Sequence, residues 1–126
     1  MGNAVFELIQ LDIPAGAGVR WALDAPGRGE PVAVGAGGGH LAGWLLSETE
    51  APCWLALRYG GQTRCYPLNV PRPDVIRAIL GGEGESHPRL ICGFARQVPL
   101  LDLLEIGVER EGVLSWFAQL KGQFPV

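Results

Sequence analysis

The feature that most constrains the fold is a pair of glycines between two strand-like segments. Gly60 and Gly61 separate residues 53–59 from residues 62–68, and each segment contains aromatic and aliphatic residues. Glycine readily adopts the positive φ angles that a two-residue hairpin turn needs. The sequence therefore predicts a tight antiparallel hairpin across residues 53–68.

Similar short apolar stretches, each followed by turn residues, recur along most of the chain. The other expected strands cover residues 5–13, 19–23, 31–34, 40–46, 90–98, 103–109 and 113–120. Short strands separated by frequent turns are typical of antiparallel sandwiches. We therefore predict an all-β chain folded as an antiparallel, immunoglobulin-like β-sandwich. Residues 1–126 suffice for one core and are expected to form a single domain.

Helical periodicity appears once, after the segment Arg72-Pro73-Asp74-Val75. Pro73 disfavours a helical conformation at Arg72, and Asp74 is expected to cap the exposed backbone N–H groups of the first turn. Replacing Asp74 with alanine should then cost about 1 kcal/mol. We expect Arg72 to brace the turn through an ion pair or carbonyl contacts.

The predicted helix is short and has one apolar face. Val75, Ile76, Ile79 and Leu80 share that face, which is expected to pack across a sheet edge. The glycines at positions 81 and 82 are expected to end the helix.

The composition limits the classes of partner. The net charge is −3 and basic residues are not clustered, which argues against nucleic acid binding. Apolar residues make up 48% of the chain, so we expect a partner domain or a second copy to cover part of the surface, as in a homodimer. Nine of the ten basic residues are arginine, and glycine, alanine and proline are abundant, which indicates a bacterial source. The sequence predicts no membrane span and no signal peptide, so we expect a cytoplasmic protein.

No set of residues predicts catalysis, a cofactor or a metal site. His40 and His87 lack a second ligand at metal-binding spacing, and the glycine-rich residues 35–39 lack the lysine of a phosphate-binding loop. Cys92 lies in an apolar run, where a buried, inert thiol is expected rather than a nucleophile. The sequence therefore predicts a protein that is not an enzyme.

The three cysteines are predicted to be small, buried, free thiols. Cys53 and Cys65 lie on opposite arms of the predicted hairpin, but a two-residue turn places their side chains on opposite faces of the sheet. A disulfide between them is therefore not expected.

Aromatic residues are the candidate ligand-binding groups. A flat ring stacks against the C–H face of a sugar while polar neighbours bond its hydroxyl groups. We select Trp44, Trp54, Tyr59 and Tyr66 as candidate glycan-binding residues, although each could instead belong to the core. Trp54 shares a strand face with Arg58 and is expected to be exposed, whereas Trp116 is expected in the core or an interface.

The order of three short motifs resembles a bacterial family. Gly43-Trp44, Arg72-Pro73-Asp74-Val75 and Gly93-Phe94 follow one another as in small β-sandwich accessory modules found beside bacterial glycosyltransferases and some methyltransferases of cell-surface polysaccharide synthesis. The resemblance covers about residues 40–98. It implies a non-catalytic module that binds a glycan or positions a glycosyltransferase domain, with Arg72, Pro73, Asp74, Gly93 and Phe94 as structural motif residues.

Two hypotheses follow. The chain is either a carbohydrate-binding accessory module or a protein–protein interaction or homodimerisation module without a ligand of its own.

Overall fold

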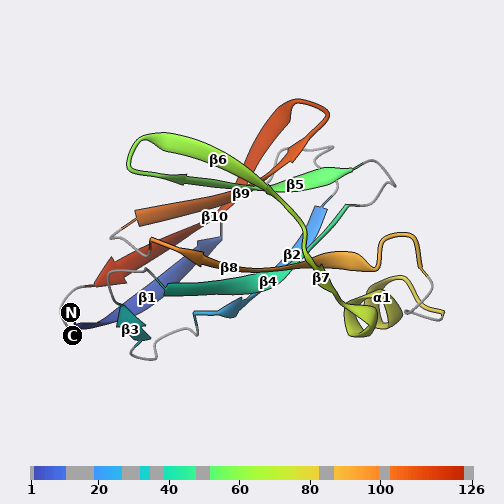
Figure 1. The fold of residues 1–126 in the computed structure, drawn as a ribbon, viewed down its shortest axis with the longest axis horizontal. Helices are drawn as coiled ribbons and strands as arrows, with labels where there is room; N and C mark the ends of the chain where they lie inside the picture. The colour runs from blue at the N-terminus through green and yellow to red at the C-terminus, as the bar shows by residue number, and fades with distance from the viewer. Residues whose placement is uncertain are drawn as a thin grey trace.

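The strands form two antiparallel sheets that pack face to face, with one short helix beside them (Figure 1). This arrangement, seen in a computed structural model, confirms the predicted all-β sandwich with one helix. The structure describes residues 2–10, 19–26, 32–34, 39–47, 52–82, 87–99 and 103–123.

The larger sheet has six strands in the order β3-β1-β10-β9-β5-β6. Their bounds are β1 Gly2–Gln10, β3 Val32–Val34, β5 Cys53–Tyr59, β6 Gln62–Pro67, β9 Leu103–Arg110 and β10 Val113–Gln123. The smaller sheet has the order β2-β4-β8-β7. Its strands are β2 Val19–Ala25, β4 Gly39–Ser47, β7 Val70–Pro71 and β8 Ile91–Val98.

The predicted hairpin of β5 and β6 is confirmed. Gly60 and Gly61 have φ angles of 58° and 76°, and Tyr59 pairs with Gln62 across the turn. Glu111 and Gly112 make the turn between β9 and β10 with φ angles of 54° and 82°. In both hairpins, two successive residues with positive φ match the twist of the flanking strands.

Some predicted strand boundaries differ from the structure. Strand β1 ends at Gln10, and the remainder of the predicted segment, residues 11–13, lies outside the described residues, as do residues 35–38 of the glycine-rich loop. Strand β10 continues to Gln123, beyond the predicted end. The two-residue strand β7 was not predicted, because it is defined only by its pairing with β8.

Side chains from both sheets fill one hydrophobic core. The buried core residues are Phe6, Leu41, Leu45, Leu55, Leu57, Phe94, Val98, Leu104, Ile106, Val108, Phe117, Ala118 and Leu120. The Trp21 ring stacks on Phe117 with 4.7 Å between the ring centroids. Burial of this apolar surface is the main force that holds the sheets together.

Two of the sequence motifs are cross-strand partners. In the ladder between β4 and β8, Gly43 pairs with Phe94 and Trp44 pairs with Gly93. A Cβ atom added to Gly43 would lie 2.9 Å from Cζ of Phe94, so the glycine leaves space for the phenyl ring. Each motif thus places a glycine opposite the aromatic residue of the other.

Helix α1 spans Pro73–Ile79 and packs against a second apolar cluster. Val75 and Ile76 are buried there together with Leu46 of β4 and Cys92 of β8. The prediction that Leu80 belongs to the apolar helix face is wrong. Leu80 follows the last helical residue and is 38% exposed.

The start of the helix also differs from the prediction. The N-cap residue is Arg72, without a side-chain capping bond, and Pro73 is the first helical residue. Asp74 is therefore already in the first turn, two positions after the N-cap residue. As predicted, the helix stops before Gly81 and Gly82, which have φ angles of 80° and 79°.

All three cysteines are free, and the hairpin register explains why Cys53 and Cys65 do not pair. Cys65 is directly opposite Ala56, three positions from Cys53, so the two thiols lie on opposite faces. The prediction of three buried thiols is wrong in part: Cys92 is buried, Cys53 is half-buried and Cys65 is exposed, because β6 is an edge strand.

Candidate functional site

The four aromatic residues selected from the sequence do not form one cluster. Trp44, in the smaller sheet, packs against the apolar cluster of helix α1, whereas Trp54 lies on β5 of the larger sheet. Tyr59 and Tyr66 pack against the main core. The structure therefore brings together Tyr59 and Tyr66 only.

Trp54 lies on the outer face of the larger sheet and is 42% exposed. In the strand register it pairs with Pro67 of β6 on one side and with Glu109 of β9 on the other. Leu114 of β10 pairs with Glu109 in turn and is 43% exposed. These four residues form a row across four neighbouring strands, which we call the Trp54 row. The 42% exposure of Trp54 confirms the prediction that this residue is exposed.

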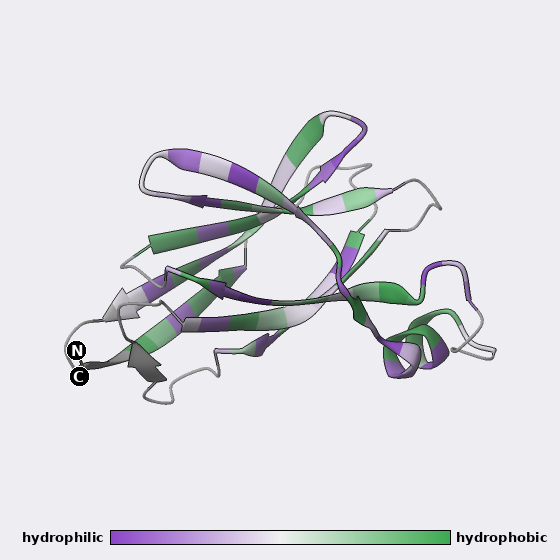
Figure 2. Cartoon of the chain, viewed as in Figure 1, coloured by the Kyte–Doolittle hydropathy of each residue, from purple (hydrophilic) through white to green (hydrophobic). Residues whose placement is uncertain are grey.

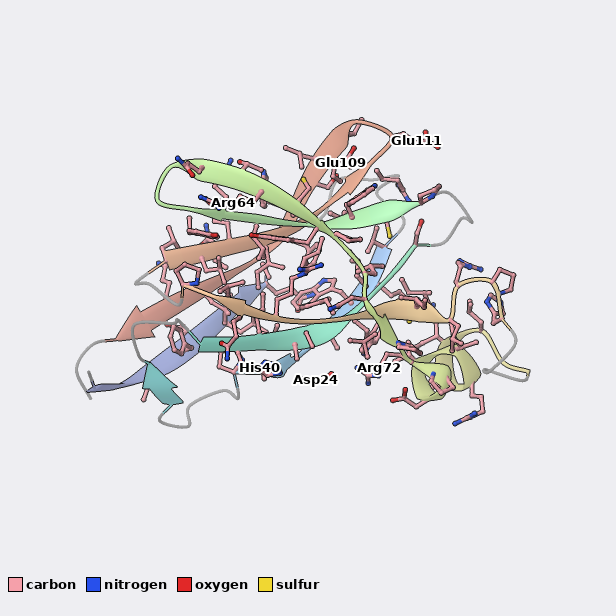
Figure 3. The ribbon with its side chains drawn as sticks, viewed as in Figure 1. Asp24, His40, Arg64, Arg72, Glu109 and Glu111 are labelled. Carbon is pink, nitrogen blue, oxygen red and sulfur yellow. The ribbon has the colours of Figure 1, made fainter. Side chains whose placement is uncertain are left out.

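Glu109, between Trp54 and Leu114 in this row, is held by the adjacent turn. Its Oε1 atom accepts a hydrogen bond of 2.7 Å from the backbone N–H of Gly112. Figure 3 shows Glu109 on the β9–β10 hairpin, on the opposite side of the sandwich from Arg72. A carboxylate therefore lies on the strand next to an exposed indole ring, and the adjacent turn fixes its orientation.

Trp116 lies on the same outer face, in the row of paired residues next to the Trp54 row. It pairs with Gly107, which pairs with the fully buried Ala56. A Cβ atom on Gly107 would lie 2.7 Å from Cε3 of Trp116, so the indole ring lies close against the glycine backbone. Trp116 is thus packed on the outside of the sheet rather than in the main core.

Arg58 covers the Trp116 ring and is fixed by a carboxylate. Its Cζ atom lies 4.4 Å from the ring centroid, and its Nε and Nη2 atoms donate hydrogen bonds of 2.8 Å and 2.7 Å to the two oxygens of Glu105. These hydrogen bonds lower the pKa of Glu105. A bidentate pair over an aromatic ring gives this face a defined geometry.

Tyr59 of β5 and Tyr66 of β6 pack against the main core, and Arg96 of β8 lies over the Tyr66 ring. Burial, and then a hydrogen bond with Tyr66, raises the pKa of Tyr59. The Arg64 guanidinium lies 5.5 Å from the Tyr59 ring, and that of Arg96 lies 4.6 Å from the Tyr66 ring. Guanidinium groups thus occupy positions over both phenol rings.

Trp44 also borders a hollow along the edge strand β2. This hollow has a volume of about 450 Å³ and is lined by Gln10, Arg20 and Trp21 as well as Trp44. It is a second place where an indole ring and polar side chains are close together.

The Arg72-Pro73-Asp74 motif connects helix α1 to strand β2. The guanidinium of Arg72 donates two hydrogen bonds of 3.0 Å to the carboxylate of Asp74 and one of 3.0 Å to Asp24 of β2 (Figure 3). The predicted brace at Arg72 is therefore an ion pair with two partners. The hydrogen bonds from Arg72 lower the pKa of Asp74 to about 2.

Several residues of the outer face were not selected from the sequence. Arg58, Glu105, Glu109 and Trp116 come from three strands, and their proximity depends on how β5, β9 and β10 pair. The burial of Tyr59 could have been predicted, because it alternates with Leu55 and Leu57 on the inner face of β5.

No family model, curated protein or solved structure matches the chain. Within the described ranges, no group of three or more histidine, cysteine or acidic residues could hold a metal ion. In the same part of the chain, no helix is long and apolar enough to cross a membrane.

Proposed function

We propose that the chain is a non-catalytic glycan-binding module, and that the sugar lies on the outer face of the larger sheet. The observation that carries the proposal is the exposed indole ring of Trp54 between Pro67 and Glu109. A sugar ring stacked on Trp54 would place hydroxyl groups near the Glu109 carboxylate, which accepts hydrogen bonds.

The neighbouring row supports binding of more than one sugar unit. Arg58 uses Nε and Nη2 for Glu105, and its Nη1 atom makes no hydrogen bond to the part of the chain that the structure describes. The N–H groups on Nη1 can therefore donate to sugar hydroxyls. Because Glu105 and Trp116 already hold the guanidinium, little side-chain entropy is lost on binding.

The biological setting of the proposal comes from the three motifs. From their resemblance to accessory modules of polysaccharide synthesis, we infer that the chain works beside a glycosyltransferase domain in the bacterial cytoplasm. In that setting the module holds a glycan close to a catalytic domain and performs no reaction itself.

The proposal is tested by tryptophan fluorescence titration with a panel of bacterial polysaccharides and their oligosaccharides. We expect a saturable change with at least one glycan and a loss of about tenfold in affinity in Trp54→Ala. Trp44→Phe, which keeps an aromatic ring beside helix α1, is the matched control and should bind as the unaltered chain does. A flat response to every glycan contradicts the proposal, as does unchanged affinity in Trp54→Ala.

A second candidate function is protein interaction through the same end of the larger sheet. Trp54, Val113 and Leu114 are 42%, 64% and 43% exposed, and Figure 2 shows the start of β10 as hydrophobic. Trp54 is on β5 and the other two residues are on β10, with β9 between these strands. Large exposed apolar side chains at one end of a sheet are typical of contact surfaces. Sedimentation velocity tests this candidate: a dimer that Leu114→Asp dissociates favours it, and a monomer at high concentration opposes homodimerisation.

A further inference from the structure

The end of the sandwich contains an apolar pocket that shares Trp54 and Pro67 with the Trp54 row and is otherwise lined by residues outside the proposed glycan site. Its volume is about 430 Å³, and it lies where β4 of the smaller sheet ends and β5 of the larger sheet begins. Its floor is formed by Leu45 and Leu46 of β4 and by Cys92 of β8, all of which are buried. The volume is in the range of small-molecule sites.

The rim of the pocket is apolar and exposed. Trp54 is 42% exposed and Ile91 is 54% exposed, and three exposed prolines complete the rim: Pro52, Pro67 and Pro88. Figure 2 shows the start of β8, which carries Ile91, as strongly hydrophobic. Because the pocket and its rim are apolar, an apolar group that displaces water from the pocket lowers the free energy of the system.

The lining of the pocket includes one positively charged side chain, Arg89. Arg89 is the one charged side chain among the described lining residues, and its Nη1 atom donates a hydrogen bond to the backbone carbonyl of Ser47. The Nη1 atom of Arg110 lies 3.0 Å from Oγ of the same serine. Two guanidinium groups therefore converge on the end of β4, at the boundary of the apolar pocket.

We propose that this pocket binds a single-chain anionic amphiphile of the fatty-acid type. The aliphatic chain would occupy the space above Leu45, Leu46 and Cys92, and the carboxylate would lie beside Arg89. A sugar fits the lining poorly, because Ser47 and Arg89 are the polar residues of a lining that is otherwise apolar. This proposal does not rest on glycan binding.

The test is isothermal titration of the full chain with octanoate and decanoate below their micellar concentrations, and with the neutral alcohol 1-decanol. We expect saturable binding of one molecule, with decanoate about tenfold tighter than octanoate because two more methylenes are buried. Arg89→Met should weaken decanoate binding about fivefold or more and leave 1-decanol binding unchanged. Arg20→Met, on the exposed edge strand β2, should leave the binding of both decanoate and 1-decanol unchanged.

Two further measurements keep the test independent of folding defects in Arg89→Met. Ile91→Asp replaces an exposed rim residue and should abolish decanoate binding. Decanoate should also protect Cys53, which lines the pocket, from alkylation in the unaltered chain. Cys65, on the edge strand β6 and absent from the lining, is the internal control and should react at the same rate with and without ligand.

Absence of saturable decanoate binding overturns the proposal. So does equal protection of Cys53 and Cys65, which would indicate a general effect of the detergent-like probe. If decanoate and 1-decanol bind alike and Arg89→Met changes neither, the pocket is not an anionic-amphiphile site. None of these outcomes decides whether a glycan binds the Trp54 row, which the polysaccharide panel tests separately.

Discussion

The side chain of Arg72 packs directly against Gly93. A Cβ atom added to Gly93 would lie 2.7 Å from Cγ of Arg72 and 3.0 Å from Cβ of Val70. The glycine thus provides the space that Arg72 needs to reach Asp24 of β2 and Asp74 of helix α1. The Gly-Phe and Arg-Pro-Asp motifs are therefore parts of one contact.

Gly93→Ala should destabilise the fold by about 1–3 kcal/mol, because the added methyl group overpacks this contact. The measurement is the free energy of unfolding in urea. A double-mutant cycle with Arg72→Ala isolates the contact: the cost of Gly93→Ala should fall when the Arg72 side chain is removed. Equal costs in both backgrounds would show that the two residues are not coupled.

Asp74 should act through its ion pair with Arg72 rather than as a helix cap. Asp74→Asn and Asp74→Ala should then lower the free energy of unfolding by similar amounts, no more than about 1 kcal/mol each, because the carboxylate is exposed. Asparagine caps helices about as well as aspartate. If Asp74→Asn is as stable as the unaltered chain and Asp74→Ala is not, capping is the main role of this residue.

The same pair should contribute to acid sensitivity. The pKa of Asp74 falls from its ordinary value of 3.8 to about 2 in the folded chain, so the unfolded chain binds the proton more readily. The stabilisation is present in full above pH 3.8 and is lost as the pH falls through about 2. Between pH 5 and pH 2, the free energy of unfolding measured in urea should fall less in Asp74→Asn than in the unaltered chain. Parallel curves would contradict the ion pair.

The three thiols should react with an alkylating reagent in the order Cys65, Cys53, Cys92. Burial of the thiol raises the pKa of both Cys53 and Cys92, and the pKa of Cys65 is raised by partial desolvation and then by the charge of Glu109. All three should therefore react slowly at neutral pH, with accessibility setting the order. Mass spectrometry of the alkylated peptides measures each rate, and rapid modification of Cys92 would contradict its burial.

Local sequence signals predict most strands and both hairpin turns of this fold. Alternation along β5 predicts that Trp54 faces outward, and the glycine pair predicts the β5–β6 turn, because both depend on neighbouring residues only. Strand β7 and the cross-strand pairing of Trp44 with Gly93 could not be predicted, because they depend on contacts between segments that are distant in the sequence.

The candidate site was predictable only in part for the same reason. Trp54 can be selected from its own strand, but Glu109 and Leu114 join it through the pairing of β5 with β9 and of β9 with β10. Asp24, the second partner of Arg72, is on β2 and follows from no local pattern.

The most direct test of glycan binding by the outer face is an amide and indole chemical-shift titration of the isotopically labelled chain with the glycan that gives the strongest fluorescence response. We predict that the largest changes occur at the indole N–H of Trp54 and at the amides of Glu109 and Leu114. Changes confined to Trp44 and Arg20, which line the hollow along β2, or no changes at saturating glycan, would contradict it.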